Sequence, residues 1–597
     1  MKDLLERVAP KAALPDAARG REGSAGPPGL TVVQEAKSRW SRTSRAVVAG
    51  VTRLANWRHF DAFLLAFLAA VVLGLRWRTL WTSYWGDEAI AIGIAAQPLH
   101  ALPRALVNDG SPPLYYVMLH FWMELFGRSE PATHSLSMAG ALAGIPVSWW
   151  CGGKLFGRWV ARGAAALVAT CAYIGYYSTE TRMYSWLALG SVLAVTCFVL
   201  AYGGAGRRYW VAAAAAMTAV LYIHYYGLYL LGALALVGTA AAMVAGSVER
   251  LRATVMYGLA CAAAFAPWVP QFAYQFSHTG APWAPTPRIW DLFVDPFNVL
   301  ASAAWPAVVV AIAFAVLWRR RSVADSESDR ASPAELQLIA TPEGPARSAR
   351  SVGFRATLSR PGPSLMLLSA VPLVTLALAW IGSQFVNSWD PRYLGVAVVP
   401  ALLPLAGGLA RVRGGLLVLC GTVVALAATA VPVLVGRGVT VENSKSDVAY
   451  LLGRLHGLLR PGDLVISAQV TDAPAVALDL GTKFIYATPL GRLADPLVVN
   501  WSNLPTRLQS INAASNLAPL LAALPEGRHV LLVDPTSWDR AESPQRYAGL
   551  VEAEAVATNT EVLSDPSLQV VATETVPRFT DPQHPMQATL FVKTAGR

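Results

Sequence analysis

Residues 84–127 read YWGDEAIAIGIAAQPLHALPRALVNDGSPPLYYVMLHFWMELFG. The stretch opens with two adjacent carboxylates, Asp87 and Glu88, and carries a third acid, Asp109, just before a Ser-Pro-Pro step. Two short amphipathic segments flank that step, and a long apolar segment precedes the whole stretch. This order predicts a polar loop held against a membrane surface.

The composition is that of a membrane protein. Of the 597 residues, 54% are hydrophobic and 14% are charged, whereas an ordinary soluble domain has about 25% charged residues. Apolar runs long enough to cross a hydrocarbon core of about 30 Å recur along the chain. The net charge of +11 is expected to collect in short cytoplasmic loops. We therefore predict a polytopic α-helical membrane protein with no nucleic-acid partner.

We predict about eleven membrane helices. The segment Leu114–Phe126 is not one of them, because it is too short to cross a bilayer and contains His120 and Glu124. We interpret this segment as an interfacial helix. The eleven approximate spans are 60–80, 133–152, 159–177, 183–203, 209–223, 226–246, 253–273, 298–318, 363–385, 393–410 and 414–435.

The distribution of positive charge supports this topology. With Leu114–Phe126 at the interface, the basic clusters between Lys154 and Arg413 all lie in the cytoplasm; if it crossed the membrane, they would all lie outside. The positive-inside rule favours the first arrangement. It predicts a cytoplasmic N-terminus and an extracytoplasmic C-terminal domain.

Composition also predicts the domain boundaries. Residues 1–58 are interpreted as a disordered cytoplasmic tail, 59–436 as the transmembrane module and 437–597 as an extracytoplasmic domain. Within the module, 81–132 is the first external loop. Residues 322–362 form a cytoplasmic linker, rich in Ser, Pro, Ala and mixed charge, that is expected to be disordered.

The last 160 or so residues have the composition of a soluble domain that can bury a core. A helical pattern at 446–459 precedes a series of short apolar segments, and such alternation predicts a small α/β domain. The strand candidates are 464–467, 484–487, 529–534, 568–573 and 589–593.

Four motifs follow one another along the transmembrane module: WGDEA, DGSPPLYYVMLHFWMELFG, YSTETRMYSWLAL and DPRYLGVAVVP. Together they resemble the membrane glycosyltransferases of the protein O-mannosyltransferase and lipid A aminoarabinose transferase type, which share the GT-C fold and are like glycosyltransferase family 39. The resemblance covers roughly residues 60–410. It implies a multi-pass plasma-membrane enzyme that moves a hexosyl or pentosyl group from a polyprenyl-phosphate donor to a cell-envelope glycan, lipid or protein on the extracytoplasmic side.

Asp87 matches the acidic residue that this family carries near the acceptor. A carboxylate within hydrogen-bond reach can take the proton of an attacking hydroxyl, so Asp87 is the predicted general base, with Glu88 as its helper or alternative. The competing interpretation is an acidic cap on a helix that starts near Ala89.

The leaving phosphate requires cations. Arg392, in DPRY, and Arg182, in TETRMY, lie at the external ends of predicted helices, and Arg binds phosphate oxygens in pairs. Local ion pairs, Glu180–Arg182 and Asp390–Arg392, or snorkelling to the interface are the alternative. Glu180 and Tyr393 are assigned to the substrate site with these arginines.

Asp109, Ser111, Tyr115 and His224 complete the predicted substrate contacts. Asp109 orients the acceptor or Ser111, or only forms an Asx turn. Tyr115 and His224 line the site, or else pack in an interfacial aromatic belt. The adjacent acids could hold a divalent cation, but the spacing fixes no third ligand, so no metal or cofactor is predicted.

Two positions depart from the family's pattern. Many relatives have His before the Pro-Pro step, where this chain has Ser111, and often Arg at the position of His134. The resemblance therefore fixes neither the donor sugar nor the acceptor.

Two other classes of protein share parts of this description. A transporter or flippase for a lipid-linked precursor would also span the membrane many times, but transporters tend to show paired halves and broken helices near the midplane. A non-catalytic membrane scaffold would use its external domain to bind a partner. The predicted topology places the 81–132 loop and the turns Ser178–Met183 (STETRM), Tyr222–Tyr226 (YIHYY) and Asn387–Tyr393 (NSWDPRY) on one external face. This gathering of polar residues at one membrane surface favours the enzyme.

The predicted topology can be tested with reporter fusions. Alkaline phosphatase fused near residue 440 should be active, because an odd number of spans puts this position outside. A fusion near residue 205, between two predicted spans, should be inactive and is the matched control. An inactive fusion near 440 would overturn the assignment of Leu114–Phe126 to the interface.

Overall fold

The computed structural model describes residues 59–301, 363–411, 419–424, 445–536, 546–576 and 585–595. The chain divides into two compact units, Met1–Phe63 and Leu64–Arg597. The predicted tail at 1–58, the linker at 322–362 and most of the predicted spans 298–318 and 414–435 lie outside the described residues. The domain boundaries proposed from composition remain predictions.

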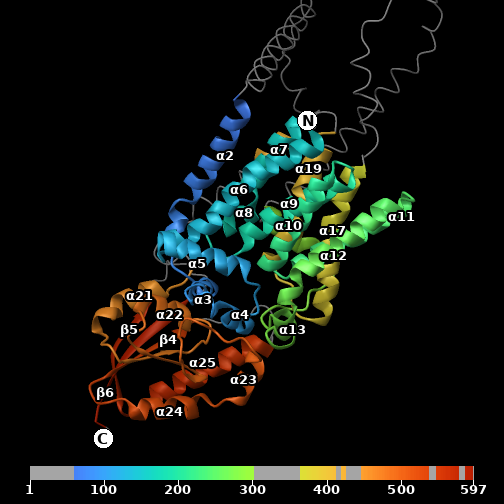
Figure 1. Cartoon of the computed structure of the whole chain (residues 1–597). Coiled ribbons are helices and arrows are strands. Elements are labelled where there is room, and N and C mark those ends of the chain that lie inside the picture. Colours follow the sequence, from blue (N-terminus) through green and yellow to red (C-terminus); the bar gives the residue numbers. More distant parts are fainter. Residues whose placement is uncertain are drawn as a thin grey trace, which may run out of the picture. The chain divides into compact units, whose positions relative to one another are not determined.

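The described residues before 412 are mainly helical, and their 3₁₀ turns are η1 (Arg78–Trp81), η2 (Ala266–Trp268) and η4 (Pro391–Leu394). The α-helices (Figure 1) are α2 (Phe60–Arg76), α3 (Gly86–Ala95), α4 (Leu102–Asp109), α5 (Leu114–Phe126), α6 (Glu130–Phe156), α7 (Arg158–Thr170), α8 (Ala172–Tyr177), α9 (Tyr184–Tyr202), α10 (Arg207–Ile223), α11 (Gly227–Val244), α12 (Val248–Phe265), α13 (Val269–His278), α14 (Asp291–Ala301), α17 (Pro363–Phe385), α18 (Gly395–Val398) and α19 (Leu402–Leu409).

Several helices are suited to a membrane, as predicted. By length and composition, four described helices can cross: Tyr184–Tyr202, Gly227–Val244, Val248–His278 and Ser364–Phe385. A fifth candidate is the pair Pro391–Val398 and Leu402–Leu409, which is bent by 47°. The predicted total of eleven spans remains a prediction.

The first external loop, 81–132, folds into three short helices whose ends follow from its sequence. The backbone N–H of Trp85 donates to the Glu88 carboxylate (3.4 Å) at the start of α3. Helix α4 ends at Gly110, which has φ +91°, a conformation that favours glycine. The Pro-Pro step precedes α5, which spans Leu114–Phe126 as a separate helix. A helix of this length is about 20 Å long, shorter than a hydrocarbon core of about 30 Å.

The C-terminal α/β domain is confirmed. Its six-stranded sheet has the order β3-β2-β1-β4-β6-β5, in which β1 is parallel to both β2 and β4 and the other pairings are antiparallel. The strands are β1 (Leu464–Ser467), β2 (Ile485–Thr488), β3 (Gly491–Arg492), β4 (His529–Pro535), β5 (Leu568–Thr575) and β6 (Met586–Lys593).

Helices cover both faces of this sheet (Figure 1). Leu464 and Ile466 of β1 pack in one apolar cluster, and Val465 packs in the other. A strand that is buried on both faces reads as a continuous apolar run, as LVIS does. The cluster of Leu464 and Ile466 includes α24 (Ala513–Ala523) and α25 (Arg546–Ser564). The cluster of Val465 includes α21 (Val448–Leu455) and α22 (Ala473–Leu480). The described part of the domain also contains α23 (Leu504–Ser510) and η6 (His456–Leu458).

The C-terminal domain packs directly on the first external loop. Helix α22 contacts α3, and Ala89 of α3 belongs to the apolar cluster of α21 and α22. The backbone N–H of Trp501 donates to the carbonyl of Asn108 at 2.8 Å. A Cβ added at Gly93 would overlap the backbone of Leu497. The loop and the domain therefore lie on the same side of the helical module.

Gly93→Ala should loosen this packing, because the added methyl group meets backbone rather than a flexible side chain. Overpacking of this kind costs about 1–3 kcal/mol. We expect a lower unfolding temperature and faster proteolysis of the C-terminal domain in micelles. Gly258→Ala is the control, since its Cβ meets nothing within 4 Å. Equal proteolysis of the two variants would contradict the close approach of Leu497.

Candidate active site

A cavity of about 370 Å³ lies where the first external loop meets the turns of the helical module that contain Arg182, His224 and Tyr393. Its walls are mostly apolar and aromatic, with acids and one arginine among them. Six of the residues predicted from sequence line it: Asp87, Asp109, Ser111, Arg182, His224 and Tyr393.

Asp87 lies in the first turn of α3 and contacts two arginines. Its Oδ2 is 2.6 Å from Nη1 of Arg392 and 3.9 Å from Nη2 of Arg182. Arg182 also donates from Nη1 to the carbonyl oxygen of Asp87 at 3.3 Å. The carboxylate is 24% exposed, so it is accessible from the cavity. The structure thus brings together three residues that are predicted to act together and are far apart in the sequence.

Of the two local ion pairs considered as alternatives, Asp390–Arg392 is present, and Glu180–Arg182 is not found among the described residues. Arg392 does pair with Asp390, whose Oδ2 accepts from Nε at 2.8 Å, in addition to its contact with Asp87. Between Arg182 and Glu180, by contrast, the described residues show no ion pair. Arg182 therefore contacts Asp87 instead of its acidic neighbour in the sequence.

Aromatic rings surround the Arg392 guanidinium. Its Cζ lies 5.6 Å from the ring centroid of Tyr393, 5.8 Å from that of Trp85 and 5.9 Å from that of Trp283. Rings at such distances attract a cation through their quadrupoles. The His224 ring packs on Tyr393, with centroids 4.5 Å apart. The YIHYY and DPRY turns thereby form one aromatic wall of the cavity.

Asp109 faces the cavity from the C-terminal end of α4. Its Oδ2 accepts a hydrogen bond from the hydroxyl of Tyr116 at 3.0 Å. Burial raises the pKa of Asp109, although Arg182 and the hydrogen bonds of Ser111 and Tyr116 oppose that rise. Gln275 of α13 fixes the segment before the Pro-Pro step by donating to the carbonyls of Leu106 (2.7 Å) and Ser111 (3.2 Å).

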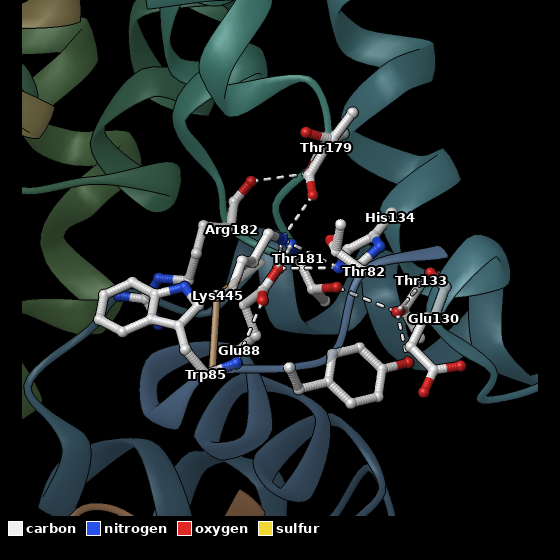
Figure 2. Close-up of polar contacts among 12 residues, drawn as sticks. Thr82, Trp85, Glu88, Glu130, Thr133, His134, Thr179, Thr181, Arg182 and Lys445 are labelled. Carbon is white, nitrogen blue, oxygen red and sulfur yellow. Dashed lines mark hydrogen bonds and ion pairs between the residues drawn. The ribbon is translucent and has the colours of Figure 1, made fainter. Parts of the chain in front are cut away.

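Glu88 points away from the cavity into a buried polar cluster (Figure 2). Its Oε1 contacts Nε2 of His134 at 2.9 Å and Nζ of Lys445 at 2.8 Å, and it accepts from the backbone N–H of Thr181 at 2.7 Å. Lys445 also donates to the carbonyl of Thr179 at 2.7 Å. We call Glu88, His134 and Lys445 the buried triad.

The charges of the buried triad can be inferred from its contacts. Nδ1 of His134 is 2.8 Å from the carbonyl oxygen of Leu80, and Nε2 faces the Glu88 carboxylate. Nε2 also lies 3.3 Å from Nζ of Lys445, so the three side chains of the buried triad are in mutual contact. Burial alone would raise the pKa of Glu88, but Lys445 and His134 together lower it to about 2. Glu88 is therefore ionised and held by its contacts with Lys445 and His134.

Glu180 lies beside this cluster and is affected in the opposite direction. Its side chain is buried, and burial raises the pKa of Glu180 to about 7, with the charge of Glu88 adding to the effect of burial and that of Lys445 opposing it. Glu180 does not line the cavity of Asp87. Its sequence-based assignment to the substrate site remains a prediction.

The buried triad holds the backbone on both sides of the Asp87–Arg182 contact. Glu88 is the residue after Asp87, and Thr181 is the residue before Arg182, so one carboxylate oxygen ties the two segments together. Lys445 adds a third segment, because it lies just before α21 of the C-terminal domain. The precise placement of Asp87 thus depends on residues from three distant parts of the chain.

Some of these residues carry no signal in the sequence. Lys445 stands alone in a polar stretch, and no motif marks it. His134 drew attention only as a departure from the family's pattern, yet its Nε2 lies 2.9 Å from Oε1 of Glu88. Tyr115, predicted as a substrate contact, is fully buried and its hydroxyl lies 3.4 Å from Ser137 Oγ. Within the described ranges, no cluster of three or more His, Cys, Asp or Glu side chains could hold a metal ion.

Known structures share this architecture. No family model and no curated protein matches the sequence. The crystal structure of ArnT from Cupriavidus metallidurans in the apo state aligns with a TM-score of 0.51 and 15% identity, covering 89% of this chain and 98% of ArnT. ArnT bound to undecaprenyl phosphate aligns equally well, with a TM-score of 0.51, 14% identity and the same coverage. The chain has the GT-C fold.

Other GT-C structures align less well. The oligosaccharyltransferase AglB from Archaeoglobus fulgidus, in complex with an inhibitory peptide and a dolichol-phosphate, gives a TM-score of 0.44 at 12% identity and covers 87% of this chain and 74% of AglB. The GT-C fold predicted from the four motifs is confirmed by ArnT. At such low identity the likeness concerns the fold alone.

Lys445→Met should destabilise the protein, because it leaves a buried carboxylate with one cation fewer. Breaking a buried ion pair costs about 3–5 kcal/mol. We expect that loss in denaturant titrations in micelles, and partial recovery in the double variant Lys445→Met/Glu88→Gln, which also removes the negative charge. Lys483→Met, at an exposed position of the same domain, should change little. No recovery in the double variant would contradict the pairing of Lys445 with Glu88.

Proposed function

We propose that this GT-C protein is a glycosyltransferase that moves a sugar from a polyprenyl-phosphate donor to a cell-envelope glycan, lipid or protein. Transfer takes place on the extracytoplasmic side of the plasma membrane. The observation that carries the proposal is the contact of one cavity-lining carboxylate, Asp87, with the guanidinium groups of Arg182 and Arg392. A general base and two phosphate-binding cations are the groups that this reaction needs in one place.

In this mechanism the acceptor hydroxyl attacks the anomeric carbon of the donor sugar. A C–O bond forms there as the bond between that carbon and the phosphate oxygen breaks. Asp87 takes the hydroxyl proton, and polyprenyl phosphate leaves with the electron pair of the broken bond. A single displacement inverts the configuration at the anomeric carbon.

The contact with Arg392 also determines when Asp87 can act as a base. Arg392 is bound to the Asp87 carboxylate at 2.6 Å and so occupies the base. A donor phosphate offers more oxygen acceptors than a carboxylate and competes for the same guanidinium group. Donor binding therefore frees the Asp87 carboxylate as it brings the anomeric carbon into the site. The base becomes available only when there is a sugar to transfer.

The remaining residues are assigned by position. Asp109, Ser111, His224 and Tyr393 line the cavity with Arg182 and are proposed as substrate contacts. Glu88 is proposed as a positioning residue rather than a second base, because it is fully buried and held by the other two members of the buried triad. The donor class is supported by the fold shared with ArnT, one structure of which is bound to undecaprenyl phosphate.

Asp87→Asn should reduce release of polyprenyl phosphate by at least about 100-fold, the typical contribution of a general base. The assay uses purified protein in nanodiscs with polyprenyl-phosphate-linked hexoses and pentoses, each with a membrane-envelope extract as acceptor. Glu124→Gln, on the exposed side of α5, is the control and should retain activity.

Three results would contradict the proposal. Full turnover by Asp87→Asn would remove Asp87 from the role of base. Retained configuration in the product would exclude the single displacement. Movement of a lipid-linked sugar across the bilayer without release of polyprenyl phosphate would favour a flippase, and neither release nor movement would favour a scaffold.

A further inference from the structure

A second cavity, of about 230 Å³, lies on the other side of Asp87. Asp87, Trp283 and Trp501 line both cavities, so the two spaces share a wall that contains the proposed base. Arg392 lines only the second cavity and Arg182 only the first. Most of the second cavity's remaining polar wall comes from the C-terminal domain.

The Gln469–Asp472 turn of that domain forms this wall beside Asp87. A Cβ added at Gly86 would lie 3.0 Å from the carbonyl oxygen of Thr471 and 3.4 Å from Oδ1 of Asp472. A larger residue before Asp87 would make this turn move by a few tenths of an ångström. The approach places the Asp472 carboxylate in the same cavity as Asp87.

Two polar groups in this cavity lack protein partners. In the described part of the chain, the Asp472 carboxylate accepts no side-chain or backbone hydrogen bond and forms no ion pair. Trp283 Nε1 is buried and likewise has no partner there. Burial raises the pKa of Asp472 to about 7. A buried polar group without a partner is costly, which applies to the Trp283 N–H. Asp472 is half-buried and lines the cavity. The two groups together suit a ligand that donates and accepts hydrogen bonds.

The other walls suit the apolar surface of such a ligand. The indoles of Trp85, Trp283 and Trp501 and the phenol of Tyr547 face the cavity. Trp283 and Trp501 form an edge-to-face pair with ring centroids 4.9 Å apart, which fixes both rings. Flat apolar faces combined with a carboxylate and the amide of Gln469 match the C–H faces and the hydroxyl groups of a saccharide.

We propose that the second cavity binds a saccharide unit of the acceptor, recognised by Asp472 and the surrounding rings. The inference rests on the proposed function and narrows its acceptor from a glycan, lipid or protein to a glycan-bearing molecule. The attacking hydroxyl reaches Asp87 from the second cavity. The donor sugar occupies the first cavity beside Arg182, and the donor phosphate reaches Arg392 where that side chain contacts Asp87 in the shared wall. The C-terminal domain thereby takes part in acceptor selection.

Direct binding tests this assignment. The full chain in nanodiscs is labelled with 5-fluorotryptophan, and the signals of Trp283 and Trp501 are identified from Trp→Phe variants. Methyl glycosides of common hexopyranoses and pentofuranoses are then titrated one by one. We expect at least one of them to shift both signals saturably.

Asp472→Asn should weaken that binding by about tenfold or more, the typical effect of losing a hydrogen bond to a charged group. The variant should fold normally, because Asp472 has no partner to lose. Glu526→Gln, an exposed acid of the same domain, should bind like the parent. Binding that is unchanged in Asp472→Asn, or no shift with any glycoside, would overturn the proposal.

A further titration distinguishes the acceptor from the donor as the source of the saccharide. The Asp87→Asn variant is loaded with the polyprenyl-phosphate sugar that the parent protein turns over, and the glycoside is added again. Simultaneous binding is the expected result, whereas displacement of the glycoside by the donor would assign this cavity to the donor sugar and overturn the inference. If the protein turns over a donor but binds no glycoside, only the saccharide site is refuted. If it binds a glycoside, and Asp472→Asn weakens that binding, but no donor is turned over, only the proposed function is refuted.

Discussion

The active-site arrangement depends on one buried carboxylate. Glu88 is completely enclosed, and an isolated charge in such a place would be very costly. Lys445, His134 and the N–H of Thr181 satisfy it, and each of these groups comes from a different part of the chain. Because the partners must converge on one oxygen atom, the first external loop, the turn before α9 and the start of the C-terminal domain are fixed together. Asp87 and Arg182 are positioned as neighbours of that point.

The fold could be predicted where local patterns determine structure. Apolar runs marked the long helices, the LVIS segment reads as a strand buried on both faces, and a segment too short to cross formed the separate helix Leu114–Phe126. The order of the motifs also indicated that Asp87, Arg182 and Arg392 would meet. The elements followed from periodicity and length, whereas the joint role of the three residues was implied by the resemblance to the glycosyltransferase family.

The remaining features depend on tertiary packing. The roles of the two adjacent acids differ because successive side chains on α3 point in different directions, Asp87 towards the cavity and Glu88 into the buried triad. Lys445 and Asp472 lie in a domain whose sequence carries no recognisable chemistry, and only the packing of α22 against α3 brings that domain to the site. Sequence spacing contains no information about a contact between residues 88 and 445.

The distance between these two residues along the chain has a consequence for biogenesis. Glu88 leaves the ribosome more than 350 residues before Lys445, and the contact joins positions separated by 357. During synthesis the first external loop therefore lacks the contact of Glu88 with Lys445 until that residue has been made. A nascent or truncated chain that holds every residue contacting Asp87 still lacks a fixed site. The segment that begins the C-terminal domain is thus needed to complete the contacts that position Asp87.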